Sequence, residues 1–149
     1  MLRVALADPA SLESLRLIAQ LDAALSAITG DSGASSFDPR DVQGLDAAFV
    51  IAWNARGEAV GCGAFRKLEG DVAELKRMYA RPGSGAGACM LADLERRAAA
   101  CGYRQVWLST RRVNTRAVGF YERHGYAPVA PWGRYVGREV SVCLGRSLG

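Results

Sequence analysis

A tyrosine near the end of the chain stands where its hydroxyl could deliver a proton. The segment from Asn114 reads Asn-Thr-Arg-Ala-Val-Gly-Phe-Tyr-Glu-Arg-His-Gly-Tyr. Ala117, Phe120 and Tyr121 recur at the spacing of one helical face, and the asparagine before them suits a helix cap. A phenol with an ordinary pKa near ~10 can donate a proton at neutral pH. Tyr121 is therefore a candidate acid, whereas packing alone accounts for Phe120, and His124 is placed only to cap carbonyl groups at the helix end.

A glycine-rich turn upstream of this segment could bind a phosphate. Gly83, Gly85 and Gly87 alternate with small residues, follow a predicted strand and open a predicted helix. Glycines let the backbone approach a ligand closely, and the free amides at a helix N-terminus attract an anion. The turn is not a Walker loop, because no Gly-Lys-Ser/Thr follows, and its late position does not suit a dinucleotide-binding fingerprint. Such a turn can also serve only to connect two elements.

The spacing of apolar residues predicts the elements that carry these two segments. Strands are expected at 2–7, 47–53, 59–65, 72–80, 104–110 and 138–144, with a short one within 126–129. Helices are expected from an Asp8-Pro9 cap to Gly30, over 87–101 and over 114–124. This order of elements predicts a single α/β domain, residues 1–149, with a mixed sheet.

Two polar stretches interrupt the apolar pattern. The loop 31–46 is long, with room for a short helix within 38–45, and loops of this length are often functional. Most of the aspartates in or near it are expected to be solvated surface groups (Asp22, Asp31, Asp38, Asp41 and Asp46). The predicted strand 72–80 carries Glu74, Lys76 and Arg77, and a carboxylate inside a sheet is costly unless it is paired or used.

Composition makes several function classes improbable. Half of the 149 residues are apolar, and the net charge of +4 comes without a dense basic run, so nucleic-acid binding ranks below small-molecule binding. Without a Cys-x-x-Cys pair and with a single histidine, no metal site is expected. The cysteines are expected to be buried, reduced thiols (Cys62, Cys89, Cys101 and Cys143). The N-terminal apolar stretch is too short for the pattern of a secretory signal, and no apolar run is long enough to cross a membrane, so a cytoplasmic protein with no membrane partner is expected.

Together these segments resemble the GNAT superfamily of acetyl-CoA-dependent N-acetyltransferases. Residues 114–126 resemble its segment N-x-x-A-x-x-[LF]-Y-E-x-x-G-[FY], residues 74–82 its fourth strand, and residues 83–87 its pyrophosphate loop. The tail within 131–144 resembles a bacterial branch whose substrates are unassigned. The resemblance covers most of the chain. It implies a mostly antiparallel sheet whose fourth and fifth strands splay apart and admit the cofactor between them.

The resemblance also implies roles for individual residues. Main-chain groups of the segment Met78, Tyr79 and Ala80 would hold the acetyl-pantetheine arm of acetyl-CoA, and Asn114 would contact that arm. Tyr121 would protonate the departing thiolate. Amides of the glycine turn would bind the pyrophosphate (Gly83, Gly85, Ala86, Gly87 and Ala88).

The turn departs from the family pattern, which usually reads P-E-x-R-G-x-G-I-G-R. Here Pro82 leads directly into Gly83, so the turn is shorter and lacks the usual basic side chains. The main-chain cradle is kept, and Arg81, Arg111 or Arg112 could supply the missing charge.

Transfer to an amine also requires an acceptor site and a group that takes a proton. A lysine-type amine has a pKa near ~10.4, so Glu74 is a candidate base, directly or through water, although an ion pair with Lys76 explains it equally well. The acceptor pocket is expected between the first helix, its following loop and residues 132–135. Trp132 and Tyr135 would form an aromatic wall for an ammonium group there, or would only pack the last strands together.

These residues predict an N-acetyltransferase that moves an acetyl group from acetyl-CoA directly to a primary amine of a small molecule or peptide. The shortened turn supports an alternative, a non-catalytic acyl-CoA-binding or regulatory domain, and a purely structural domain is a third possibility. The identity of the acceptor and the oligomeric state stay open, although many proteins of this fold form homodimers.

Overall fold

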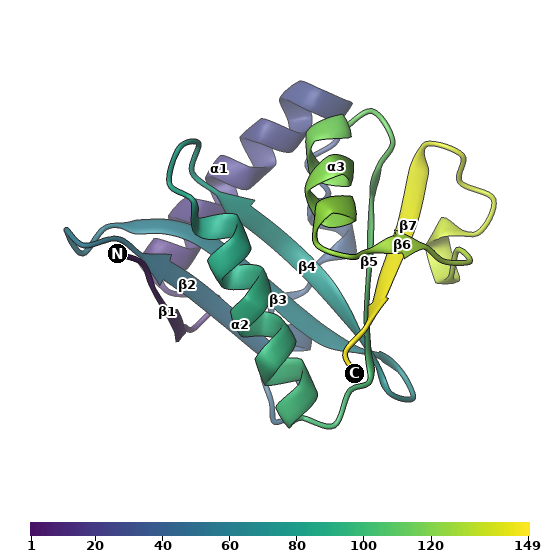
Figure 1. The fold of residues 1–149 in the computed structure, drawn as a ribbon. Helices are drawn as coiled ribbons and strands as arrows, with labels where there is room; N and C mark the ends of the chain where they lie inside the picture. The colour runs from purple at the N-terminus through teal and green to yellow at the C-terminus, as the bar shows by residue number, and fades with distance from the viewer.

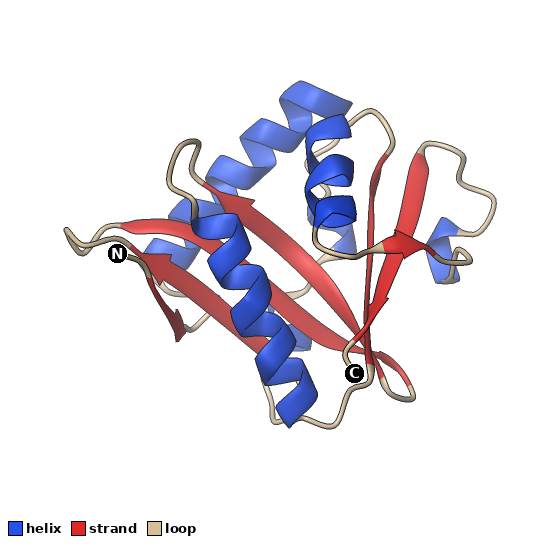
Figure 2. Cartoon of the chain, in the orientation of Figure 1, coloured by secondary structure: helices blue, strands red, loops and turns tan.

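The computed structural model describes residues 1–149 and contains one seven-stranded sheet flanked by helices (Figure 1). The strands are β1 Arg3–Leu6, β2 Ala48–Trp53, β3 Ala59–Glu69, β4 Val72–Ala80, β5 Gln105–Arg111, β6 Ala127–Pro128 and β7 Ser141–Ser147. The α-helices are α1 Leu12–Thr29, α2 Ala86–Ala100 and α3 Thr115–Arg123, and the 3-10 helices are η1 Ala34–Ser36, η2 Pro39–Val42 and η3 Gly133–Tyr135. Figure 2 shows how α2 crosses the face of the sheet.

The sheet is mixed, in the order β1-β2-β3-β4-β5-β7-β6. Neighbouring strands are antiparallel except β4 and β5, which run parallel. Parallel neighbours need a long crossover, and α2 provides it. The predicted architecture, a mostly antiparallel mixed α/β sheet, is confirmed.

The two faces of the sheet are covered by different helices. Val50 of β2 and Phe65 of β3 belong to one core together with Tyr121 of α3 and the buried side of α2. Phe49, the neighbour of Val50 on the same strand, packs instead with Leu17 of α1. Because successive side chains of a strand point to opposite faces, α1 covers one face of the sheet while α2 and α3 cover the other.

Strands β4 and β5 share only a short paired segment. Their register runs from Val72 opposite Gln105 to Glu74 opposite Trp107. Beyond Glu74 the two strands separate, as the ribbon shows (Figure 1). The splay of the fourth and fifth strands is therefore present, and it leaves the facing edges of both strands without a neighbouring strand.

A bulge bends β4 shortly after it leaves β5. Between the pairs made by Cys62 and Ala64, β4 carries one extra residue, so that Gly63 alone opposes Arg77 and Met78. Arg77 has a φ of 55°, in the left-handed region that non-glycine residues rarely adopt. A Cβ at Gly63 would fall 2.4 Å from the Met78 sulfur, so glycine is required for this close approach.

Several element boundaries differ from the prediction, and β3 runs on to Glu69 instead of ending at 65. Helix α1 begins after Ser11, whose Oγ accepts a hydrogen bond from the Ser14 amide, and not at Asp8. The carboxylate of Asp8 instead accepts from the Ala10 amide, which makes a turn before the helix. Strand β7 begins at Ser141 rather than at 138, because the Ser141 amide closes a turn onto the carbonyl of the residue three positions earlier.

The four cysteines lie in two different environments, which corrects the expectation that all are buried. Cys62 and Cys143 are buried, whereas Cys89 and Cys101 are exposed, and none forms a disulfide. Cys89 lies on the outer side of α2, and Cys101 follows the last residue of that helix. Burial raises the pKa of the Cys62 thiol to about 12.

We expect Ellman's reagent at pH 8 to modify two thiols of the native protein rapidly and the other two only after unfolding in guanidinium. Only a thiolate reacts, and burial disfavours both the thiolate and the approach of the reagent. Cys89→Ser and Cys101→Ser should each remove one fast-reacting thiol. Four thiols reacting at one rate in the native protein would contradict the structure.

Candidate active site

A cavity lies where β4 and β5 separate. Its walls come from α1 and the loop that follows it, from β4 and β5, from the start of α3 and from the segment around η3. Of the residues predicted to act, this cavity brings together Glu74, Met78, Asn114, Tyr121 and Tyr135.

Tyr121 reaches the cavity from α3. Asn114 caps this helix by accepting a hydrogen bond from the Ala117 amide over 3.3 Å, as predicted. Tyr121 is 8% exposed and packs edge-on against the rings of Phe120 and Tyr126. Burial raises the pKa of its phenol well above the ordinary value of 10, and no hydrogen bond contributes to that shift. Tyr121 therefore keeps its proton over the whole physiological pH range.

Phe120 joins α3 to the glycine turn. A Cβ at Gly87 would fall 3.3 Å from the Phe120 ring, so the glycine permits a close approach between α2 and α3. His124 stacks with the same ring at 4.4 Å between centroids, and its Nδ1 lies 2.8 Å from the Phe120 carbonyl oxygen. The predicted assignments of Phe120 to packing and of His124 to capping are both confirmed.

The glycine turn has an open backbone conformation. Gly83 and Gly85 have φ values of 80° and 72°, and Gly85 is the N-cap of α2. No atom lies within 4 Å of a Cβ placed at either position, so a ligand can approach the main chain there.

Some of the backbone amides in the first turn of α2 are free to bind an anion. The amides of Gly87 and Ala88 have no acceptor in the turn. The Ala86 amide, also expected to bind phosphate, instead donates to Ser84 Oγ over 3.2 Å. A helix N-terminus with free amides fits a phosphate group of coenzyme A through main-chain contacts.

The three arginines considered as substitutes for the missing basic side chains are engaged elsewhere. Arg81 donates to a carbonyl of β3 over 3.2 Å, and Arg112 donates to the Glu139 carbonyl over 2.7 Å. Arg111 pairs with Asp31 at 2.8 Å, in the cavity beside Tyr121. The charge of Arg111 is thus directed to the cavity rather than to the turn.

The three residues of β4 predicted to hold the pantetheine arm lie beyond the last pair with β5. Met78 lines the cavity, whereas Tyr79 packs with the core on the α1 side of the sheet. Ala80 lies next to Gly87, 3.9 Å from a Cβ placed there. Their main-chain groups stand along the edge of β4 that β5 leaves uncovered, which is where a ligand would add as an extra strand.

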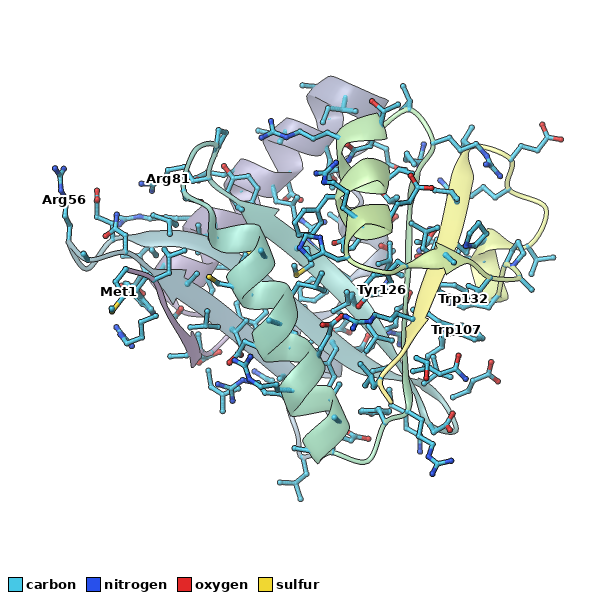
Figure 3. The ribbon with its side chains drawn as sticks, in the orientation of Figure 1. Met1, Arg56, Arg81, Trp107, Tyr126 and Trp132 are labelled. Atoms are coloured by element: carbon cyan, nitrogen blue, oxygen red, sulfur yellow. The ribbon has the colours of Figure 1, made fainter.

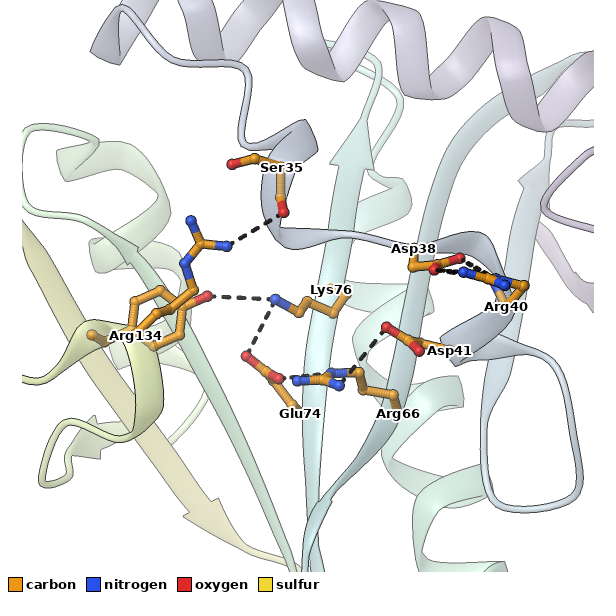
Figure 4. Close-up of polar contacts among 9 residues, drawn as sticks. Ser35, Asp38, Arg40, Asp41, Arg66, Glu74, Lys76 and Arg134 are labelled. Carbon is orange, nitrogen blue, oxygen red and sulfur yellow. Dashed lines mark hydrogen bonds and ion pairs between the residues drawn. The ribbon is translucent and has the colours of Figure 1, made fainter.

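Glu74 is buried, at 1% exposure, between two cations. Arg66 Nε donates to Glu74 Oε1 over 3.0 Å, and Lys76 Nζ lies 3.4 Å from Oε2 (Figure 4). Lys76 also donates to the Tyr135 hydroxyl over 3.4 Å, and Arg66 lies 3.8 Å from Asp41. The predicted pair of Glu74 with Lys76 is confirmed. The contact with Arg66 was not predicted, because it depends on the register that places β3 beside β4.

Arg77 is a cavity residue for which no role was predicted. Its side chain is 5% exposed, forms an ion pair with Asp22 of α1 and donates to the Ser32 carbonyl over 3.1 Å. The guanidinium also lies 5.7 Å from the centroid of the Phe37 ring. Arg77 therefore ties β4 to α1 and to the loop after it. The signal in the sequence was a basic residue on a strand that is otherwise buried.

Two of the five aspartates expected at the surface hold cavity arginines. Asp22 pairs with Arg77, and Asp31 pairs with Arg111. The amide of Gly33 and, after it, the nearby arginines hold the pKa of Asp31 below its ordinary value. These contacts could not be anticipated from the sequence, because the partners lie far apart along the chain.

The two aromatic residues expected in the acceptor pocket take different places. Tyr135 lines the cavity that contains Tyr121, whereas Trp132 lines a neighbouring cavity that shares the Tyr135 wall. Between ring centroids, Trp132 lies 5.5 Å from Trp107 of β5 (Figure 3). The ring of Tyr135 lies 5.3 Å from that of Trp132. Trp132 thus packs against β5 and lines the neighbouring cavity rather than the one around Tyr121, and its role in the acceptor site stays a prediction.

The family model described as "Acetyltransferase (GNAT) family" matches residues 20–126, which run from the second half of α1 through α3 and include most of the cavity residues. The chain belongs to the GNAT acetyltransferase family. One structure of similar fold is that of a GNAT family acetyltransferase from Elizabethkingia anophelis with acetyl-CoA bound. That protein shares the fold of this chain at a TM-score of 0.71 and 12% identity, over 98% of this chain and 97% of the other.

Two further relatives are more similar in sequence. A crystal structure from Klebsiella pneumoniae, described provisionally as an acyl-CoA N-acyltransferase, has a TM-score of 0.84 and 28% identity over 100% of this chain and 99% of the other. A protein from Azospirillum brasilense named "IAA acetyltransferase" is 28% identical over 138 residues, which are 90% of each chain.

No helix combines the length and the apolar character needed to cross a membrane. Nowhere do three or more His, Cys, Asp or Glu side chains gather closely enough to hold a metal ion.

We expect Asp22→Asn to lower the free energy of unfolding by about 2 kcal/mol, because the substitution leaves the buried Arg77 without a countercharge. The loss is moderate because Asp22 is itself partly exposed to water. Urea denaturation measures this change. The matched control is Arg40→Gln, which breaks the exposed pair with Asp38 and should cost less than about 1 kcal/mol. Equal effects of the two substitutions would show that Arg77 does not brace α1 against β4.

Proposed function

We propose that this protein transfers an acetyl group from acetyl-CoA directly to a primary amine of a small molecule or peptide, with Tyr121 as the general acid. The observation that carries this proposal is the place of Tyr121. Its buried phenol lines the cavity between β4 and β5, and its hydroxyl has no partner within the protein.

Two surfaces of the chain would hold acetyl-CoA. The free amides of Gly87 and Ala88 would bind the pyrophosphate, and the open backbone at Gly83 and Gly85 would let it approach. The uncovered edge of β4 after Glu74 would bind the pantetheine arm through main-chain groups, in the manner of an added strand. The thioester would then lie in the gap that Tyr121 faces.

The chemistry forms one bond and breaks one. The amine nitrogen attacks the thioester carbonyl, the new C–N bond forms, and the C–S bond breaks as the tetrahedral intermediate collapses. Tyr121 gives its proton to the departing thiolate, and the surplus proton of the amine passes to Glu74, directly or through water. No cysteine lines the cavity, so no thiol is placed to take the acetyl group first, which supports direct transfer.

We expect Tyr121→Phe to lower kcat about 100-fold, because the thiolate must then leave without a positioned acid. The affinity for acetyl-CoA, measured by calorimetry, should change by less than about two-fold. Tyr126→Phe is the matched control: its hydroxyl donates to Glu95 over 2.8 Å, away from the cavity, so its loss should leave kcat unchanged.

Unchanged turnover of Tyr121→Phe would remove this residue from the acid role. Tight binding of acetyl-CoA without CoA release from any amine of a broad library would favour a non-catalytic acyl-CoA-binding domain instead.

We expect Glu74→Gln to lower kcat about 100-fold and to change the acidic limb of the pH–rate profile, if Glu74 takes the proton of the amine. Lys76→Met is the comparison variant, because it removes the second member of the ion pair without removing the carboxylate. A fall in melting temperature with an unchanged pH–rate profile for Glu74→Gln would assign Glu74 to structure alone.

A further inference from the structure

The side of the cavity formed by the end of β5 and the segment around η3 carries more cations than carboxylates. Arg111 Nη2 lies 2.8 Å from Asp31 Oδ2, and Arg138 Nη2 lies 3.9 Å from the same oxygen. Arg134 has no carboxylate partner, and its Nη1 donates only to the Ser35 carbonyl over 3.4 Å (Figure 4). All three arginines line the cavity, and Asp31 is the only carboxylate that forms an ion pair with any of them.

The other cations of the cavity are matched. Arg77 is compensated by Asp22, and Lys76 by Glu74, which it shares with Arg66. The surplus positive charge therefore lies at Arg134 and Arg138, on the part of the cavity wall that also includes Tyr135.

Coenzyme A does not account for this surplus. The cavity wall includes Leu21 and Leu25 of α1, on the face of the sheet opposite α2. None of the residues 83–88 of the glycine turn lines the cavity. The arginines thus stand on the side from which the acceptor would enter, away from the amides that suit the phosphates.

We propose that the amine acceptor carries a carboxylate, which Arg134 and Arg138 bind while its amino group is directed toward Tyr121 and Glu74. This inference rests on the proposed acetyltransferase activity and adds the substrate class: a small amino acid rather than a simple amine or a polyamine.

Three features of this side of the cavity suit a carboxylate. A guanidinium group presents parallel N–H donors that match the two oxygens of a carboxylate, and such bonds are stronger than those between neutral groups. Asp31 is accepting from the Gly33 amide over 2.9 Å, so it is held in place and in turn holds Arg111 at the cavity wall. The side chain of Arg138 is 32% exposed, so water screens it only in part.

The first test compares substrates of the wild-type protein. CoA release is measured with the common L-amino acids and with their carboxamides, which carry the same amine and side chain but no carboxylate. We expect kcat/KM for the preferred amino acid to exceed that of its carboxamide by about ten-fold or more. Chemistry alone would favour the carboxamide, because its amine is less basic and more of it is neutral near pH 7.5.

The second test uses Arg134→Gln and Arg138→Gln, with Arg56→Gln as the control in the exposed turn between β2 and β3 (Figure 3). Each of the first two should raise KM for the amino acid about ten-fold, with kcat, the carboxamide rates and the acetyl-CoA affinity unchanged. The control should change none of these. Melting temperatures establish whether each variant is folded. If one arginine variant is unfolded, the other still tests the site.

Three outcomes would overturn the inference while leaving the proposed function intact. The first is a higher kcat/KM of the wild-type protein for carboxamides than for amino acids. The second is a fall in kcat/KM of the arginine variants that is equal for amino acids and carboxamides. The third is a weaker affinity of those variants for acetyl-CoA. If no amine gives CoA release, the proposed function fails, and the inference is judged by calorimetry with N-acetyl amino acids and their amides. Binding of the acids alone, lost in Arg134→Gln, would support the carboxylate site, and no binding would overturn it.

Discussion

The parting of β4 from β5 after Glu74 is the constraint on which the rest of the structure depends. Three residue pairs join these parallel strands, and beyond them each strand presents an edge of main-chain groups that no strand covers. Buried N–H and C=O groups need partners, so such a gap is stable where a ligand or solvent can enter. The extra residue at Arg77 and Met78 bends β4 at the start of the gap, and Gly63 leaves the space that the bend needs.

Ion pairs rather than apolar contacts brace the walls of the gap. Arg77 fixes α1 and the following loop to the bulge, and Glu74 gathers Arg66 and Lys76 where β3, β4 and β5 still run together. Buried pairs add little net stability, because desolvation offsets the attraction, but removing one partner is strongly destabilising. We interpret these pairs as a means of holding polar walls in one arrangement around a cavity that an apolar core would fill.

The two faces of the sheet divide the proposed work between them. The glycine turn and α3 lie on the face that suits coenzyme A, and α1, its loop and the η3 segment form the side from which the acceptor would enter. Tyr121 belongs to the first set of elements and yet lines the cavity of the second. A single buried phenol between the two is consistent with an acid that acts on the leaving group while the amine arrives from the other side.

The sequence by itself determined the fold class, the order of elements and the residues with local signals. Apolar periodicity located the strands, Asn114 marked the start of α3, and alternating glycines marked the turn before α2. Only the tertiary structure decided which charges form pairs. Asp22 with Arg77 and Asp31 with Arg111 join distant segments, and Arg66 meets Glu74 only through the register of β3 on β4. The tertiary structure also separated Trp132 from the cavity of Tyr121 and left two cysteines exposed. Periodicity and capping act within a few residues of chain, whereas ion pairs and exposure depend on sheet register and on how helices pack across it.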